Sequence, residues 1–211
     1  MTEPVRDGSE RLVMFTDAVA AIALTLLILP LLETISDVEP TATAADLVRD
    51  HIGQFGAFAF SFAVIFRFWW AHHRIFGHIS RLNVQLVQYS TLWTFGVVLL
   101  PIPTAIITAV HPSPASVALY GGALVLVTGS MSMIALTAFR HPEVSEGRTP
   151  VPREALLGTV TVFGAQVVAT IVGSVFADSI NFWAFLLMFL VGPVERLIKA
   201  RWRKADQPVA S

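Results

Sequence analysis

Arg11–Leu32 reads RLVMFTDAVAAIALTLLILPLL, an apolar stretch long enough to cross a lipid bilayer as a helix. It nevertheless carries an acidic side chain, Asp17, close to its start. A carboxylate inside a membrane helix costs several kcal/mol unless it is paired or hydrated, so we expect Asp17 to have a polar partner elsewhere in the fold. The segment therefore predicts a membrane protein and poses the question of what faces Asp17.

The whole composition is that of an integral membrane protein. Of the 211 residues, 55% are hydrophobic and only 14% are charged, and the mean hydropathy is +0.68. A soluble domain with a polar surface does not reach such values. A membrane helix needs about 20 apolar residues, and the charge and proline clusters divide the chain into six stretches of that kind. They cover residues 12–32, 50–72, 84–109, 116–139, 154–177 and 180–199.

We therefore predict an all-α integral membrane protein with six transmembrane helices. Residues 1–211 are expected to form a single domain, with a short N-terminus over 1–11 and a basic C-terminal tail over 200–211. The first span superficially resembles a signal peptide, but its length and its aspartate predict that it is not cleaved. Cysteine is absent from the sequence, which excludes disulfides, iron–sulfur clusters and thiolate zinc sites.

The basic residues predict the orientation in the membrane. With six spans, all of the 14 Lys and Arg residues except Arg49 fall on the same side. Loops rich in positive charge stay in the cytoplasm. Both termini are therefore expected to be cytoplasmic, in a multi-pass protein of the plasma membrane.

The loop between the first two spans is acidic and is expected to lie outside the cell. Two interpretations stay open: an acidic outer mouth that attracts cations, or a solvated loop whose exposed charges are screened by salt. The acidic residues of this loop are Glu33, Asp37, Glu39, Asp46 and Asp50.

The first span has two different sides when it is drawn as a helix. A period of 3.6 residues places Phe15, Ile22 and Leu29 on nearly one line and turns Asp17 roughly to the opposite side. The residues that flank the line are Ala18, Thr25 and Leu26. From periodicity alone, this apolar ladder either faces lipid or has a function of its own.

The second span ends in RFWWAHHR over residues 67–74, a cluster of aromatic, imidazole and basic groups. Interface anchoring accounts for the tryptophans. His72 and His73 are the first candidate partners of Asp17, followed by Arg11 and Arg67. A metal site is not expected at the histidine pair, because adjacent residues on a helix point about 100° apart.

Further along the chain, proline and small residues predict local features of the helices. Pro101 and Pro103 must break or kink the third span. The fourth and fifth spans are rich in glycine and serine, which let membrane helices approach closely. Gln166 and Asn181 are expected to form hydrogen bonds between helices.

Four motifs, taken in order, carry a family resemblance. They are Arg11-x-x-x-Phe15-Thr16-Asp17, the AIALTLL run over 21–27, the Trp69-Trp70 pair with His72-His73, and LPIPT over 100–104. This order resembles the endolysosomal potassium channel family (transmembrane protein 175 type), and specifically its short bacterial members with a single six-helix unit. The resemblance covers nearly the whole chain. The family signature has serine where this chain has Thr16, and its third span has asparagine where this chain offers Tyr89-Ser90.

The resemblance implies a homotetramer in the bacterial cell membrane, with the first helix of each subunit lining a central pore. Carried over by position, Ile22, Leu26 and Leu29 would form an apolar constriction, and Thr25 would supply a hydroxyl layer that affects cation preference. The remaining motif residues would brace the pore helix against the second and third spans. These brace residues are Arg11, Phe15, Thr16, Asp17, Trp70 and either His72 or His73.

The function implied by the resemblance is a potassium-permeable cation channel with a weak preference for potassium over sodium. Its partners would be further copies of itself, membrane lipids and monovalent cations, with no nucleic acid. No cofactor or tightly bound metal is expected, only permeating potassium near Ile22 and Thr25. An enzyme is not expected, because the spans offer no nucleophile, base and orienting group together. The alternative is a proton-coupled secondary transporter of a small solute, with Asp17 and His72 or His73 as a proton relay.

Overall fold

The computed structural model describes residues 8–36, 43–111 and 113–177, and within these ranges the chain is built from helices. The prediction of an all-α membrane fold is confirmed. In chain order the elements are α1 (Gly8–Leu26), α2 (Leu29–Ser36), α3 (Ala44–Asp50), α4 (Ile52–Phe76), α5 (Val84–Leu99), α6 (Pro101–Ala109), α7 (Pro114–Arg140), the 3-10 helix η1 (Pro142–Ser145) and α8 (Arg153–Val175).

Five segments of the described residues are long and apolar enough to cross a membrane. They are Gly8–Ile35, Ile52–Phe76, Val84–Ala109, Pro114–Arg140 and Arg153–Val175. Each coincides with one of the first five predicted spans, although the first helix begins at Gly8, within the stretch expected to be the N-terminal extension. The sixth predicted span, 180–199, and the basic tail, 200–211, lie outside the described residues.

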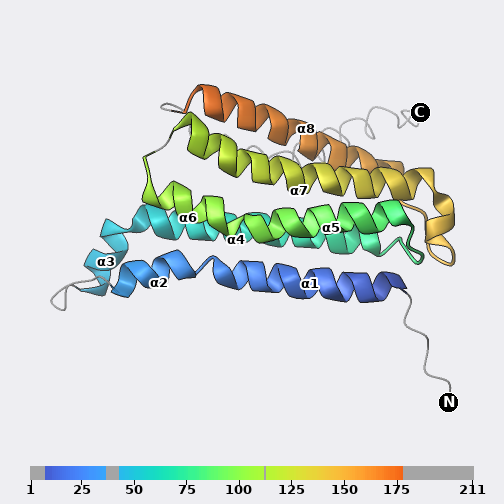
Figure 1. The fold of residues 1–211 in the computed structure, drawn as a ribbon, viewed down its shortest axis with the longest axis horizontal. Helices are drawn as coiled ribbons and strands as arrows, with labels where there is room; N and C mark the ends of the chain where they lie inside the picture. Colours follow the sequence, from blue (N-terminus) through green and yellow to red (C-terminus); the bar gives the residue numbers. More distant parts are fainter. Residues whose placement is uncertain (1–7, 37–42, 112, 178–211) are drawn as a thin grey trace, which may run out of the picture.

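The long helices lie side by side (Figure 1). The α1–α2 segment packs against α4, α5 and α6, whereas α7 packs against α5 and α6 on one side and against α8 on the other. One end of the bundle therefore gathers the start of α1, the α4–α5 turn and the α7–α8 connection (Figure 1). The short helix α3 lies at the opposite end (Figure 1).

Proline breaks two of the spans. The first span is interrupted between Leu26 and Leu29, because Pro30 has no N–H to donate to the preceding turn. A bond of 3.3 Å from the Ile28 N–H to the Thr25 carbonyl closes the break. The span predicted over 12–32 is therefore present but contains a break that the sequence analysis did not predict.

The break predicted in the third span is confirmed. Helix α5 ends at Leu99 and α6 begins at Pro101. The hydroxyl of Thr104 lies 2.8 Å from the Leu100 carbonyl oxygen and 3.0 Å from the Ser61 hydroxyl, so polar groups surround the interrupted turn. A membrane helix tolerates proline where such groups satisfy the freed backbone.

Small residues bring α7 and α8 close together, as predicted. A Cβ atom added at Gly121 would lie 2.5 Å from the Thr170 side chain, and one added at Gly129 would lie 3.1 Å from Phe163. Gln166 lies buried on α8, but its amide has no hydrogen-bond partner among the described residues. The expected hydrogen bond between helices is therefore not found for Gln166, and Asn181 lies outside the described residues.

Candidate functional site on the first helix

Helix α1 has one covered side and one uncovered side. The covered side carries small or short side chains that pack toward α4 and α5, which allows close approach of the helices. The buried residues of this side are Ser9, Thr16, Ala20 and Ala23, followed by Leu27 and Leu31 beyond the end of α1. Among the described residues, no other helix covers the opposite side.

The predicted apolar ladder lies on the uncovered side. The exposed fractions are 59% for Ile22, 40% for Leu26 and 49% for Leu29. Phe15 and Thr25 are exposed on the same side. A row of large apolar side chains that no described part of the chain covers is a candidate for contact with lipid, with another subunit or with a pore.

Thr25 is the polar member of this row. Its hydroxyl lies 2.7 Å from the Ile22 carbonyl oxygen and donates its hydrogen to it, as hydroxyls commonly do inside membrane helices. The oxygen keeps its lone pairs, which face away from the backbone. Thr25 therefore offers an oxygen ligand on an otherwise apolar surface.

Asp17 is held by residues of α4. The indole Nε1 of Trp69 donates a hydrogen bond of 2.8 Å to the Asp17 carboxylate. The Nδ1 atom of His73 lies 3.9 Å from the same carboxylate. Of the two candidate histidines, His73 is therefore the one near Asp17.

The tryptophan donor was missed by the sequence analysis, which assigned Trp69 to the membrane interface. The signal that could have found it is chemical: an indole N–H held below the membrane surface needs an acceptor. Asp17 is the acidic side chain of the neighbouring span at the same end of the bundle. Carboxylate and indole therefore satisfy each other.

The other predicted brace residues lie in different environments. Thr16 is buried, and its hydroxyl donates to the Val13 carbonyl of its own helix over 2.9 Å. Trp70 is half exposed and stacks on His73, with ring centroids 6.2 Å apart. Arg11 and Phe15 are exposed at the start of α1.

His72 has a separate environment from its neighbour. It is completely buried between two aromatic rings, with its centroid 4.4 Å from that of Phe76 and 4.2 Å from that of Trp93. Neither ring nitrogen has a hydrogen-bond partner within the described residues. In the same part of the chain, no three His, Cys, Asp or Glu side chains gather as a metal site would require.

One residue of the acidic outer loop has a structural use. Asp46 forms a capping box with Thr43 at the start of α3, and its carboxylate lies 3.5 Å from the Arg49 guanidinium. The hydrogen bonds from the Thr43 hydroxyl and N–H lower the pKa of Asp46 below its usual value. Asp37 and Glu39 lie outside the described residues.

Comparison of the sequence with known proteins finds similarity to potassium channels. The family model described as the endosomal/lysosomal potassium channel TMEM175 matches residues 11–101. A potassium channel of Chamaesiphon minutus is 31% identical over 111 residues, which are 52% of this chain and 55% of the channel's own length. A potassium channel of Chryseobacterium sp. is 29% identical over 147 residues, or 69% of this chain and 71% of that one.

Solved structures share the fold over a longer stretch. A lysosomal potassium-selective channel TMEM175 homolog from Chamaesiphon minutus superposes with a TM-score of 0.58 at 22% identity, covering 87% of this chain and 96% of that one. A variant of the potassium channel MtTMEM175, solved with a nanobody fusion protein, gives 0.54 at 14% identity, with 97% and 99% covered. These relatives are described as channels and not as enzymes. Over residues 11–101 the sequence is similar to the TMEM175 family, and over most of its length the chain shares the fold of these two solved structures.

Proposed function

We propose that this chain is the subunit of a potassium-permeable cation channel, a homotetramer in which α1 of each subunit lines a central pore. The proposal extends to this chain the activity stated in the names of its relatives. It assigns the constriction to Ile22, Leu26 and Leu29, and a hydroxyl layer to Thr25. It also assumes a bacterial plasma membrane and cytoplasmic termini, which the distribution of Lys and Arg supports.

The observation that carries the proposal is the uncovered side of α1. Three large apolar side chains there have no cover from the described residues, although the opposite side of the same helix packs tightly through alanines. Helix α8 also has an exposed apolar side with a threonine, but α1 and not α8 lies within the residues that the potassium channel family model matches, 11–101. Four copies of α1 around an axis would enclose a narrow apolar neck.

A neck of this kind has predictable properties. Ile22 and Leu26, both in α1, are about 6 Å apart along the axis at 1.5 Å per residue, and Leu29 follows directly after the helix break, so the dry stretch would be short. An apolar constriction stops ions by excluding water, and conduction requires it to widen or to become wet. Selectivity would be modest, because hydroxyls and not a ring of carbonyls would replace the hydration shell.

The test is potassium flux into proteoliposomes that contain purified protein. Ile22→Ala should raise the flux at least about threefold, because a smaller side chain widens and wets the neck. Ile171→Ala is the matched control, since Ile171 on α8 is 58% exposed, nearly the same as Ile22. Absence of flux in every variant, or an equal effect of both substitutions, would contradict the proposal.

The role of Thr25 is tested by selectivity. Thr25→Val keeps the shape of the side chain and removes its hydroxyl, so the potassium-to-sodium permeability ratio should fall toward one while flux persists. Thr161→Val on α8 is the control, because Thr161 is also exposed and its hydroxyl also donates to its own helix. An unchanged ratio in Thr25→Val would refute the hydroxyl layer.

One observation keeps the alternative of a proton-coupled transporter in view. The Asp17 carboxylate and the Nδ1 atom of His73 lie 3.9 Å apart, so two titratable groups of the kind that a proton relay uses are neighbours here. That transporter would take up a solute in proportion to the proton gradient and lose uptake when a protonophore is added. Potassium flux that persists with the protonophore present favours the channel.

A further inference from the structure

We propose that Arg148 is a positioning residue that fastens the cytoplasmic end of α1 to the rest of the subunit and thereby influences conduction. Arg148 lies in the connection between α7 and α8, far from the pore residues in the sequence. Its link to conduction rests on the proposed function, but its effect on α1 can be measured without any ion flux.

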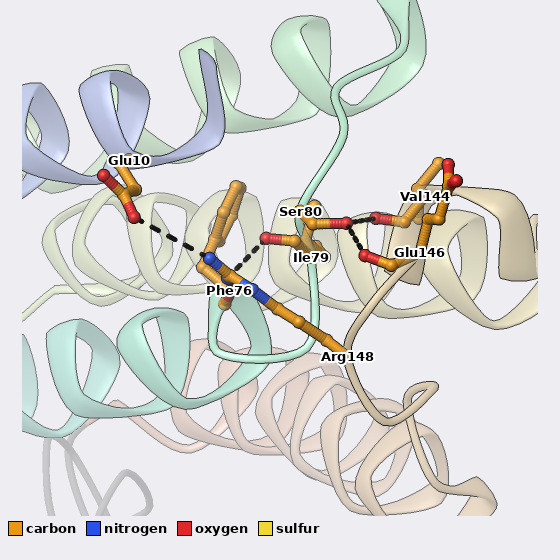
Figure 2. A network of polar contacts seen from close by, with 7 residues as sticks. All are labelled: Glu10, Phe76, Ile79, Ser80, Val144, Glu146 and Arg148. Atoms are coloured by element: carbon orange, nitrogen blue, oxygen red, sulfur yellow. Dashed lines mark hydrogen bonds and ion pairs between the residues drawn. The ribbon is translucent and has the colours of Figure 1, made fainter. Parts of the chain in front are cut away.

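Arg148 joins three segments of the chain at one point (Figure 2). Its Nη1 atom donates to the carbonyl oxygens of Phe76, at 3.2 Å, and Ile79, at 2.7 Å. These carbonyls lie at the end of α4 and in the turn after it; the Phe76 carbonyl also accepts from the Ile79 N–H over 3.0 Å, so Arg148 adds a second donor to a helix end. The Nη2 atom lies 4.0 Å from the carboxylate of Glu10 in the first turn of α1. Only a long, forked side chain can serve carbonyls and a carboxylate together.

The platform that carries Arg148 is itself fixed. The Ser80 hydroxyl lies 2.6 Å from the Glu146 carbonyl oxygen and 3.3 Å from that of Val144 (Figure 2). The backbone N–H groups of Ser80 and Arg81 both donate to the Val144 carbonyl. An ion pair of 2.6 Å joins Arg81 to the Glu146 carboxylate. The α7–α8 connection and the α4–α5 turn therefore behave as one unit.

The start of α1 rests on this unit. Ser9 is 1% exposed, although it is only the second residue of the helix, and Gly8 faces the Leu82 side chain. From Glu10 to Ile22 the helix rises about 18 Å, so the contact lies far from the neck and cannot touch the ion. Because α1 is a rigid helix, a tilt that begins at Glu10 also displaces Ile22. Loosening Arg148 should therefore alter how readily the neck opens and leave its selectivity unchanged.

The anchoring is tested by thiol labelling. The protein has no cysteine of its own, so Ser9→Cys introduces a single buried thiol. Adding Arg148→Gln should speed labelling by a maleimide at least about tenfold, because local opening exposes a buried group. Arg148→Lys should be intermediate, since lysine keeps the charge near Glu10 but lacks the fork. Arg140→Gln, which removes the same charge from the exposed end of α7, should change nothing.

The effect on conduction is tested with the same single substitutions in proteoliposomes. Arg148→Gln should change potassium flux at least about threefold with an unchanged potassium-to-sodium ratio, because the selectivity residues are untouched. Glu10→Gln leaves both carbonyl contacts of Arg148 in place and should change potassium flux in the same direction but more weakly. If Arg148→Gln fails to give a monodisperse protein, Glu10→Gln replaces it as the test variant. Labelling that is no faster, or flux that is unchanged while labelling is faster, would overturn the proposal. A wild type that conducts no potassium would instead refute the proposed function, and the labelling would still test the anchor.

Discussion

The closest approach of α7 and α8 makes a sharp prediction about Gly121. A Cβ atom at this position would lie 2.5 Å from both Cγ2 and Oγ1 of Thr170, and 2.9 Å from its Cβ. Threonine is branched at Cβ and cannot swing its side chain aside without a change of rotamer. Gly121→Ala therefore requires the two helices to separate by about 1 Å, which disturbs a packed interface.

The neighbouring glycine supplies the matched control. A Cβ atom at Gly122 meets nothing within 4 Å. Both substitutions gain the same helix propensity, about 0.5–1 kcal/mol, so their difference isolates the cost of overpacking. We expect Gly121→Ala to be less stable than Gly122→Ala by about 1–3 kcal/mol. Unfolding in mixed micelles by added dodecyl sulfate, followed by tryptophan fluorescence, measures this difference.

A third variant tests the cause of the loss. Thr170→Ala removes the two atoms at 2.5 Å and leaves the Cβ at 2.9 Å. In combination with Gly121→Ala it should recover part of the lost stability, because contacting residues are not additive. Equal stability of Gly121→Ala and Gly122→Ala would refute the reasoning and would mean that α8 lies farther from α7.

Two further predictions concern the polar groups. Trp69→Phe removes the donor to the Asp17 carboxylate and should cost about 1–3 kcal/mol in the same unfolding assay, whereas Trp70→Phe, which keeps that donor, should cost less; equal losses would contradict the bond. Thr43→Val should raise the pKa of Asp46 toward its ordinary value of 3.8, because the Thr43 hydroxyl is the main cause of the lowering. Since a lowered pKa means that the carboxylate favours the folded cap, the capping contribution is present above pH 3.8 and is lost as the pH falls through the pKa of the folded protein. Carbon-detected NMR titration of Asp46 measures the shift, and an unchanged pKa would contradict this cause.

The membrane fold could be predicted because it depends on strong, local signals. Twenty apolar residues between charged or proline clusters define a span, and the five spans of the described residues begin or end within a few residues of the expected positions. The break at Pro101 was predicted for the same local reason. The break before Pro30 was not predicted, although this proline removes a donor from the helix in the same way.

The brace around Asp17 was predicted only in outline. The cost of burying a carboxylate predicted that Asp17 has a polar partner. The partner was expected at the end of the second span, because that end lies at the same depth in the membrane as Asp17. The choice among Trp69, His72 and His73 depends on rotation about the helix axis and on which side faces α1. That rotation depends on the neighbours of α4 in the bundle, including α1, α6 and α7, together with Trp93 of α5, which stacks on His72.

The first span is held by two kinds of contact, polar contacts near its ends and apolar packing between them. Polar contacts to other elements occur at Glu10, Asp17 and Thr34, whose hydroxyl lies 2.7 Å from the Gln54 side-chain oxygen. These contacts are directional and hold the two ends of the first span in register. Between them, the covered side packs through Ala20 and Ala23, and apolar contact is non-directional. The first span is therefore held by polar contacts near both of its ends, and the helix break before Pro30 lies between them. Because this break separates Ile22 from Leu29, the two ends of the apolar ladder belong to different helical segments, and only the α1 part moves as one rigid body with Glu10.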